Sequence, residues 1–360
     1  MAVKYHDELN QRNMEKIHEL ENELPSYVHE YILSIAASTT TRTRLRYLYN
    51  LRIFFLYLKE RNPELVNQSI GTISCDQLDM LTANDLDEYM DYLRMYRTQE
   101  NNVVTNNNAA IKQKLSSVRS LFHFLYKREY IKGNPAELIR MPKIRDKAII
   151  HLEPNESAAL LAYVEEKGST LSGRALQKYN REKSRDLAII TTLLGTGIRV
   201  SELVGLDLDD IDFDNNSLMV FRKGEKESFV YFGDEVSDAL EAYMDDRLLI
   251  TADTGHKNAL FLSDRKQRIS VRTVERLVKG YSSCIATNKK ITPHGLRRSY
   301  GTALYEDTSD IYLVSSALGH RDINTTKKHY AAMDENRKRS ILSKFHLRES
   351  RDDGQTDNLE

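Results

Sequence analysis

The chain has 360 residues, 40% of them hydrophobic and 29% charged, which is typical of a soluble globular protein and about twice the usual length of one domain. Its 52 Lys and Arg nearly balance its 53 Asp and Glu, so the total charge gives no indication of nucleic-acid binding, and such a function must rest on local charge. No apolar run is long enough to span a bilayer, and the N-terminus lacks the apolar stretch of a signal peptide, which predicts a cytoplasmic protein without membrane insertion.

The two cysteines, Cys75 and Cys284, occur outside any CxxC motif or Cys/His cluster at metal-ligand spacing. This pattern favours neither a disulfide framework nor a zinc site, and we expect no metal and no cofactor. Both residues are expected to be buried small hydrophobes.

The first half of the chain predicts helices. Residues 11–33 form two helical pieces broken at Pro25, because proline cannot continue a helix, and residues 1–36 are expected to be an N-terminal extension. Residues 39–43 are a threonine-rich cap before an amphipathic helix, and Thr82 caps a further helix that runs to residue 95.

The helix over residues 111–125 has the clearest apolar stripe, and basic side chains lie outside it. Basic side chains also surround the start of the helix after residue 43, where threonine hydroxyls beside arginines suit phosphate contacts. A solvated charged face is the alternative interpretation. The candidate DNA contacts in these two helices are Arg42, Arg44, Lys112, Lys114 and Arg119.

A proline and several charges in residues 141–147 predict an exposed linker between two domains. We expect a helical domain over residues 37–141, a linker over 142–152 and a second domain over 153–348. The polar residues 349–360 are expected to be a disordered tail.

The second half mixes helices with a β-hairpin. A buried helix over residues 187–194 ends in a glycine-containing turn that places Arg199 at the start of the next helix. Strand-like residues 217–221 and 228–232 flank the basic segment 222–226, which predicts a hairpin whose tip could enter a DNA groove. An exposed turn without function is the alternative for the hairpin alone.

Thr292 and Pro293 suit the start of a helix, the first as its cap and the second in its first turn. His294 and Arg297 are three residues apart, so they are expected on one side of that helix.

Further along, Gly319 is a helix stop beside His320, and residues 324–326 are expected to cap a helix that carries Tyr330. Each of these polar residues alone is common on a protein surface, so only their occurrence together indicates a functional site.

The set resembles tyrosine site-specific recombinases, the phage integrase family. The motifs appear in that family's order and approximate spacing at residues 196–203, 223–224, 294–297, 318–320 and 330. Within the family the chain is most similar to the Xer recombinases, particularly the stand-alone XerS type. The resemblance implies a mainly α fold with a small β-sheet: a helical SAM-like core-binding domain followed by a mixed α/β catalytic domain.

The resemblance also implies a catalytic set. Its members are Arg199, Lys223, His294, Arg297, His320 and Tyr330. Tyr330 would attack the scissile phosphate, giving a 3′-phosphotyrosine and a free 5′-hydroxyl, because a phosphotyrosyl ester stores the bond energy. Arg199 and Arg297 would clamp the phosphate, since planar guanidinium groups match two of its oxygens.

In the same set, Lys223 would protonate the departing 5′-oxygen, His320 would hydrogen-bond the phosphate in the transition state, and His294 would assist as acid or base. Lys226 is the alternative lysine, because Arg222 stands where the family usually has the first glycine of a Gly-Lys-Gly turn.

Three residues near this set have other expected roles. Arg222 and Arg298 are further candidate DNA contacts, and His329 is interpreted as a surface or DNA-facing residue.

The partners implied by the resemblance are double-stranded DNA with a dif-like site and an FtsK-type septal DNA translocase. The function would be chromosome dimer resolution during chromosome segregation and cell division. A homotetramer on two sites is expected, with an apolar helix around residues 341–345 packed into a neighbouring protomer or, alternatively, onto its own domain.

Three other functions remain open at this point. An integrase of a phage or mobile element would share the chemistry, as would a type IB topoisomerase that works as a monomer. A non-catalytic architectural DNA-binding protein would need only the basic helices.

Overall fold

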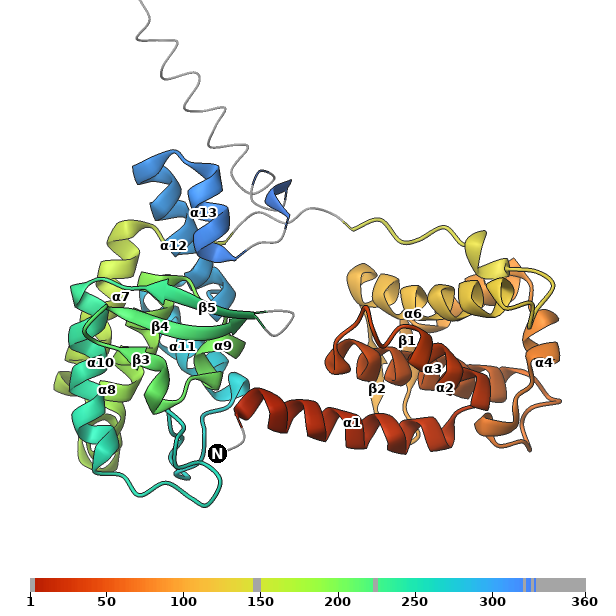
Figure 1. Cartoon of the computed structure of the whole chain (residues 1–360), viewed down its shortest axis with the longest axis horizontal. Coiled ribbons are helices and arrows are strands. Elements are labelled where there is room, and N and C mark those ends of the chain that lie inside the picture. The colour runs from red at the N-terminus through yellow and green to blue at the C-terminus, as the bar shows by residue number, and fades with distance from the viewer. Residues whose placement is uncertain (1–3, 145–149, 223–225, 320–321, 325–326, 328–360) are drawn as a thin grey trace, which may run out of the picture. The chain divides into compact units, whose positions relative to one another are not determined.

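The computed structural model describes residues 4–144, 150–222, 226–319, 322–324 and 327. The chain divides into two compact units, Met1–Lys147 and Ala148–Glu360. The first is helical with one small hairpin, and the second combines helices with a three-stranded sheet, which is the predicted fold class (Figure 1).

Helices make up most of the first unit. They are α1 (Tyr5–Glu23), α2 (Ser26–Ser34), α3 (Thr41–Arg61), α4 (Cys75–Asp79), α5 (Ala83–Tyr92) and α6 (Asn108–Lys127), with 3₁₀ turns at η1 (Ile70–Thr72) and η2 (Pro135–Glu137). Strands β1 (Met95–Arg97) and β2 (Val103–Thr105) pair antiparallel. The predicted helix over residues 83–95 therefore ends at Tyr92, and residues 95–105 form a hairpin that the polar sequence did not indicate.

The predicted N-terminal extension is part of this unit's core. Ile17 of α1 and Val28 of α2 are fully buried in the same cluster as Phe54 of α3 and Phe122 of α6. A short helix that buries an apolar face gains more from packing on its neighbours than from its own propensity. Helices α1 and α2 therefore do not form an appendage.

The second unit contains helices and short strands in mixed order. The helices are α7 (Pro154–Glu166), α8 (Gly173–Thr196), α9 (Val200–Gly205), α10 (Asp234–Leu248), α11 (Val271–Ile285), α12 (Pro293–Thr308) and α13 (Ile311–Leu318), with 3₁₀ turns at η3 (Lys167–Thr170) and η4 (Leu208–Asp210). The strands are β3 (Ile211–Asp212), β4 (Ser217–Arg222) and β5 (Lys226–Tyr231), in the order β3-β4-β5.

Helix α8 runs through the core of the second unit and packs beside α7, α10 and α12 (Figure 1). Its C-terminal half is buried on nearly all sides, through residues such as Ile189, Ile190 and Leu193. Strands β4 and β5 form the predicted hairpin, and their ladder ends at the pair Arg222 and Lys226. The C-terminal end of α8, which leads into the turn at Gly197, therefore lies in the core.

The cysteines differ from expectation. Cys75 is half-buried and Cys284 is exposed. Cys284 lies off the buried stripe of α11, which passes through Val274, Val278 and Tyr281. It therefore does not face the core.

Candidate active site

The turn after α8 places Arg199. Gly197 ends the helix in a left-handed conformation with φ 61°, and a Cβ at this position would lie 2.3 Å from the ring of Tyr300. Glycine therefore allows both the backbone angle and the close packing of the ring. Two residues later Arg199 begins α9, with its side chain 38% exposed.

Glu202 holds Arg199 in place. Nη1 of Arg199 donates to Oε1 of Glu202 at 2.7 Å, and the backbone N–H of Arg199 donates to Oε2 at 2.8 Å. The carboxylate is almost fully buried. The predicted site did not assign Glu202 a role, although its position three residues after the arginine, on the next helical turn, is visible in the sequence.

Arg297 is buried in the second unit. Helix α12 begins as predicted, with the Thr292 hydroxyl accepting from the Gly295 backbone N–H at 3.2 Å. Arg297, one turn later, is only 3% exposed; its Nη1 donates to the Gly197 carbonyl at 2.5 Å and its Nη2 donates to the Leu318 carbonyl. This guanidinium thus links the turn before Arg199 to the end of α13.

The C-terminal end of α13 is where the arginines meet. The helix packs on α12 through Val314 and Leu318, and Gly319 ends it with φ 59°. The last carbonyls of a helix have no partner within it and carry the negative end of its dipole. At the end of α13, guanidinium groups of arginine side chains donate hydrogen bonds to these carbonyls.

Three arginines bind these carbonyls, and we call them the arginine cluster: Arg199, Arg222 and Arg297. Arg222 donates to the carbonyls of Ser316 at 3.2 Å and Ala317 at 2.9 Å, Arg297 donates to that of Leu318, and Arg199 donates to that of Gly319 at 3.2 Å. Four consecutive carbonyls thus bind side chains from β4, α12 and the start of α9.

Charge within the cluster is only partly balanced. Burial lowers the pKa of Arg222 most, the nearby Glu202 carboxylate raises it in part, and the Arg199 charge lowers it again. Arginine nevertheless remains protonated in proteins. Several guanidinium groups around one carboxylate make a positive site, and planar guanidinium groups bind phosphate oxygens in pairs.

The structure describes part of the predicted catalytic set. It brings Arg199 and Arg297 together at the end of α13. His294 lies on the exposed surface of the first turn of α12, whereas Arg297 is buried. Lys223, His320 and Tyr330, like His329 and the helix expected around residues 341–345, lie outside the described residues.

The predicted DNA contacts of the first unit fall into two groups. Arg42 and Lys112 are exposed. Lys114 donates to Oδ1 of Asn106 at 2.9 Å, and burial lowers the pKa of this lysine.

The other two basic residues of that prediction also contact protein atoms. Arg119 donates to the carbonyls of Ala136 at 3.1 Å and Glu137 at 2.7 Å. Arg44 is half-buried and contacts the sulfur of Met14 at 3.6 Å.

Arg298 in the second unit is half-buried. Its Nε is buried and makes no hydrogen bond to the residues that the structure describes.

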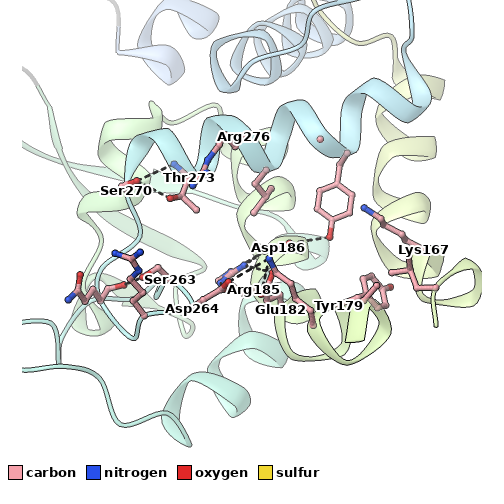
Figure 2. Close-up of a pocket in the computed structure, with 18 of the residues that line it drawn as sticks. Lys167, Tyr179, Glu182, Arg185, Asp186, Ser263, Asp264, Ser270, Thr273 and Arg276 are labelled. Carbon is pink, nitrogen blue, oxygen red and sulfur yellow. Dashed lines mark hydrogen bonds and ion pairs between the residues drawn. The ribbon is translucent and has the colours of Figure 1, made fainter. Parts of the chain in front are cut away.

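A cavity of about 840 Å³ lies at the other end of α8 (Figure 2). Arg185 borders it and is buried, donating to Oδ1 of Asp186 at 2.8 Å and of Asp264 at 3.2 Å. The Tyr281 hydroxyl donates to the second oxygen of Asp186 at 3.1 Å. These bonds join α8, α11 and the loop between α10 and α11.

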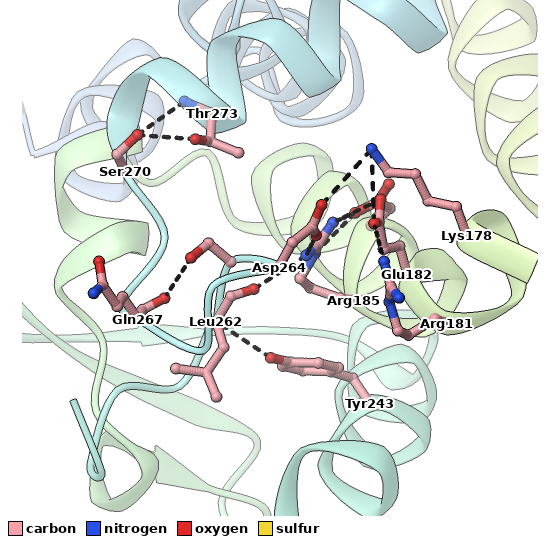
Figure 3. A network of polar contacts seen from close by, with 12 residues as sticks. Lys178, Arg181, Glu182, Arg185, Tyr243, Leu262, Asp264, Gln267, Ser270 and Thr273 are labelled. Atoms are coloured by element: carbon pink, nitrogen blue, oxygen red, sulfur yellow. Dashed lines mark hydrogen bonds and ion pairs between the residues drawn. The ribbon is translucent and has the colours of Figure 1, made fainter. Parts of the chain in front are cut away.

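Glu182 and Lys178 extend this network (Figure 3). Burial, and then a hydrogen bond with Asp264, raises the pKa of Glu182. Residue 185 lies twelve residues before Gly197, a separation of about 18 Å along a helix at 1.5 Å per residue. The network therefore fixes the position of α8 but lies away from the arginine cluster.

The described part of the chain has neither a metal-ligand cluster nor a helix that could span a membrane. No three His, Cys, Asp or Glu side chains there are grouped as ligands of a metal ion would be. No helix within it has the length and apolar character needed to cross a membrane.

Comparison with known proteins identifies the family. The phage integrase family profile matches residues 151–337, more than half of the 360-residue chain. The tyrosine recombinase XerC of Caldanaerobacter subterraneus subsp. tengcongensis is 30% identical over 89% of this chain and 86% of its own. The tyrosine recombinase XerS of Streptococcus agalactiae is 32% identical over 91% of this chain and 98% of its own.

Solved structures share the fold. The XerH site-specific recombinase bound to palindromic difH substrate aligns with a TM-score of 0.63 and 20% identity, over 92% of this chain and 88% of that one. A lambda integrase dimer bound to a core site aligns with a TM-score of 0.53 and 16% identity, over 83% and 96% of the two chains. The chain thus belongs to the phage integrase family and is a tyrosine recombinase of the Xer type, an enzyme that cuts and rejoins DNA through a phosphotyrosine intermediate.

Proposed function

We propose that this recombinase resolves chromosome dimers at a short dif-like DNA site during chromosome segregation and cell division. The observation that carries the proposal is the near full-length match to XerS, which covers 91% of this chain and 98% of the relative. The shared fold with XerH bound to difH substrate supports the choice of DNA site. An FtsK-type septal DNA translocase is the proposed partner, and the cytoplasm the proposed location.

The arginine cluster supports the assignment of phosphate binding. In the proposed reaction, Arg199 and Arg297 bind the non-bridging oxygens of the scissile phosphate. Their guanidinium groups already donate to carbonyl oxygens, those of Leu318 and Gly319 at the end of α13 and that of Gly197 after α8, so oxygen acceptors suit their present orientation. Phosphoryl transfer depends mainly on such positioning and charge stabilisation.

The bond changes are assigned to three side chains. The phenol oxygen of Tyr330 forms a bond to phosphorus while the bond from phosphorus to the 5′-oxygen breaks. Lys223 gives its proton to that 5′-oxygen, and His294 accepts the phenol proton. His320 donates a hydrogen bond to the phosphate in the transition state. Rejoining reverses these steps with the 5′-hydroxyl of the exchanged strand.

The role of Lys223 can be tested against that of Lys226. Lys223→Ala is expected to slow cleavage of ordinary DNA by roughly 10²–10⁴-fold, the usual contribution of general acid catalysis. A 5′-bridging phosphorothiolate substrate should restore cleavage, because sulfur leaves without a proton. Rescue of Lys226→Ala, without rescue of Lys223→Ala, would assign the role to Lys226 instead.

The chromosomal role calls for a different experiment. The Tyr330→Phe variant, expressed in the source cells and mapped by chromatin immunoprecipitation, should bind one short chromosomal site. Cells that lack the protein should accumulate chromosome dimers. Binding confined to the ends of a mobile element, with normal chromosome segregation in the deletion strain, would favour an integrase.

A homotetramer on two DNA sites is also proposed, with the helix expected around residues 341–345 docking on a neighbouring protomer. Exchange of this kind closes a ring when each copy donates and accepts one segment. It would make cleavage depend on assembly, because the segment follows Tyr330 closely in the sequence.

A further inference from the structure

Arg222 connects the hairpin to the last turn of α13. It is the final residue of β4, and its guanidinium binds the carbonyls of Ser316 at 3.2 Å and Ala317 at 2.9 Å. These carbonyls lie 94 and 95 residues further along the chain. A single side chain therefore joins the end of β4 to the last turn of α13.

The end of α13 is shaped to receive this guanidinium. Gly319 approaches Arg222 so closely that a Cβ there would lie 2.2 Å from Nη1 and 2.5 Å from Cζ of the arginine. The backbone N–H of Gly319, whose φ is positive, donates to the Ser316 carbonyl at 2.9 Å, so this carbonyl accepts from both the glycine and the arginine. The glycine thus allows the arginine to approach the turn closely.

Both Nη atoms of Arg222 are used in these bonds, while Nε is buried and has no hydrogen-bond partner among the described residues. Burial of the guanidinium beside Arg199 is unfavourable and is only partly offset by Glu202. Such a position suits a side chain that holds two elements of the protein together better than one that moves to contact DNA. The earlier expectation of a simple DNA contact does not account for these bonds.

In the sequence, the two residues that meet here are each next to a proposed catalytic residue. Lys223 directly follows Arg222, and His320 directly follows Gly319. Among the described residues, the β4-β5 ladder ends at the pair Arg222 and Lys226. A fixed end of β4 would limit where the next residue can lie.

We infer that Arg222 is a positioning residue for DNA cleavage, which holds the hairpin end against the last turn of α13 so that the general acid meets the 5′-oxygen. The inference rests on the proposed function. It assigns Arg222 no contact with the reacting atoms. Its loss should therefore affect proton delivery more than phosphate binding or attack by the tyrosine.

The test compares two leaving groups in single-turnover cleavage. Arg222→Met keeps an unbranched apolar stem but removes the guanidinium and with it the bonds to both carbonyls. We expect cleavage of ordinary DNA to slow by roughly 10²-fold, the scale of a 1 Å misplacement in an active site. On the 5′-bridging phosphorothiolate substrate the loss should be only a few-fold, with DNA affinity and melting temperature close to those of the wild type.

Arg222→Lys gives a second measurement if the methionine variant does not fold. An ammonium keeps the charge but cannot span two carbonyls as the planar fork does. An intermediate loss on ordinary DNA, again rescued by sulfur, is expected. Arg174→Met, which changes an exposed arginine in the first turn of α8, is the matched control and should cleave both substrates normally.

Normal cleavage by both Arg222 variants would overturn the inference, as would an equal loss on the two substrates. An equal loss would mean that Arg222 acts on the phosphate or on the fold as a whole. Covalent adduct formation by the wild-type protein separates these results from a failure of the proposed function. If the wild type forms no adduct with either substrate, the proposed chemistry fails, whatever the variants do.

Discussion

Arg199 and Glu202 form a closed pair in which a buried carboxylate holds a half-exposed guanidinium. The side-chain bond is 2.7 Å and the bond from the Arg199 backbone is 2.8 Å, so both carboxylate oxygens are engaged. The other end of the guanidinium reaches the Gly319 carbonyl. Hydrogen bonds to Glu202 and Gly319, rather than burial of the side chain, thus orient Arg199.

Glu202→Gln is expected to slow cleavage with little effect on DNA affinity. A hydrogen bond to a charged group contributes about 1.5–3 kcal/mol, so its loss at the transition state corresponds to roughly a ten- to hundredfold slower step. Single-turnover cleavage measures the change. Glu156→Gln, which alters a partly exposed ion pair with Lys289 at 2.6 Å, is the control and should cleave normally. Wild-type cleavage rates in Glu202→Gln would contradict the assigned orientation.

DNA binding is expected to depend steeply on salt despite the formal net charge of −1, because local basic residues on both units would contact phosphates. Affinity measured from about 50 to 200 mM salt should fall by roughly 10³-fold or more. A flat dependence would contradict this expectation.

Two basic residues of α6 should respond differently in the same assay. Lys112 is exposed, so Lys112→Ala should lower the salt slope by about 1 with unchanged stability. Arg119 binds the carbonyls of Ala136 and Glu137, so Arg119→Ala should mainly destabilise the first unit, by about 1–3 kcal/mol. Urea unfolding separates the two effects. An unchanged unfolding midpoint in Arg119→Ala would show that its carbonyl bonds add little.

The first unit should lose stability in alkali. Burial raises the pKa of Tyr27 and Tyr31 above the ordinary value of 10, and their folded forms therefore favour the protonated phenol. This stabilisation is fully present below pH 10 and is lost as the pH rises above 10, by about 1.4 kcal/mol per pH unit for each tyrosine.

Tyr27→Phe provides a direct check. The variant loses the bond from the hydroxyl to the Ile73 carbonyl at 3.0 Å, so it should be about 1 kcal/mol less stable at pH 8. Above pH 10 its stability should fall less steeply than that of the wild type. Urea unfolding at pH 8, 10 and 11 gives both slopes, and identical slopes would show that Tyr27 does not contribute.

Truncation tests the expected role of the last helix. A chain ending after Met333 should bind one half-site but lose cooperative filling of the second, together with most recombination. A chain ending after Glu349 should behave almost as the wild type does. Gel shifts on half and full sites measure both, and full cooperativity in the shorter chain would remove this helix from assembly.

Local patterns predicted much of the fold. The stripe through Ile111, Leu115 and Phe122 predicted α6, because a helix buries every third or fourth residue. The Thr292 cap and the Gly319 stop were also predicted correctly, since both act within a few residues.

Features that depend on distant partners could not be predicted in this way. The first half of α8 was missed because its side chains, apart from the buried Tyr179, are exposed or half-buried and form no apolar stripe. Arg222 was interpreted as a DNA contact because the carbonyls that it binds lie more than 90 residues away. The positions of Lys223, His320 and Tyr330 remain predictions.

Tyr330 is the proposed nucleophile of DNA cleavage. The most direct test incubates the wild type and Tyr330→Phe with a nicked suicide substrate that carries a candidate site, followed by a denaturing gel. The wild type should give a covalent protein-DNA band and the variant none, while both bind the DNA with nearly equal affinity, because one hydroxyl adds little to an interface dominated by phosphate contacts. A normal yield of the covalent band from Tyr330→Phe would contradict the claim.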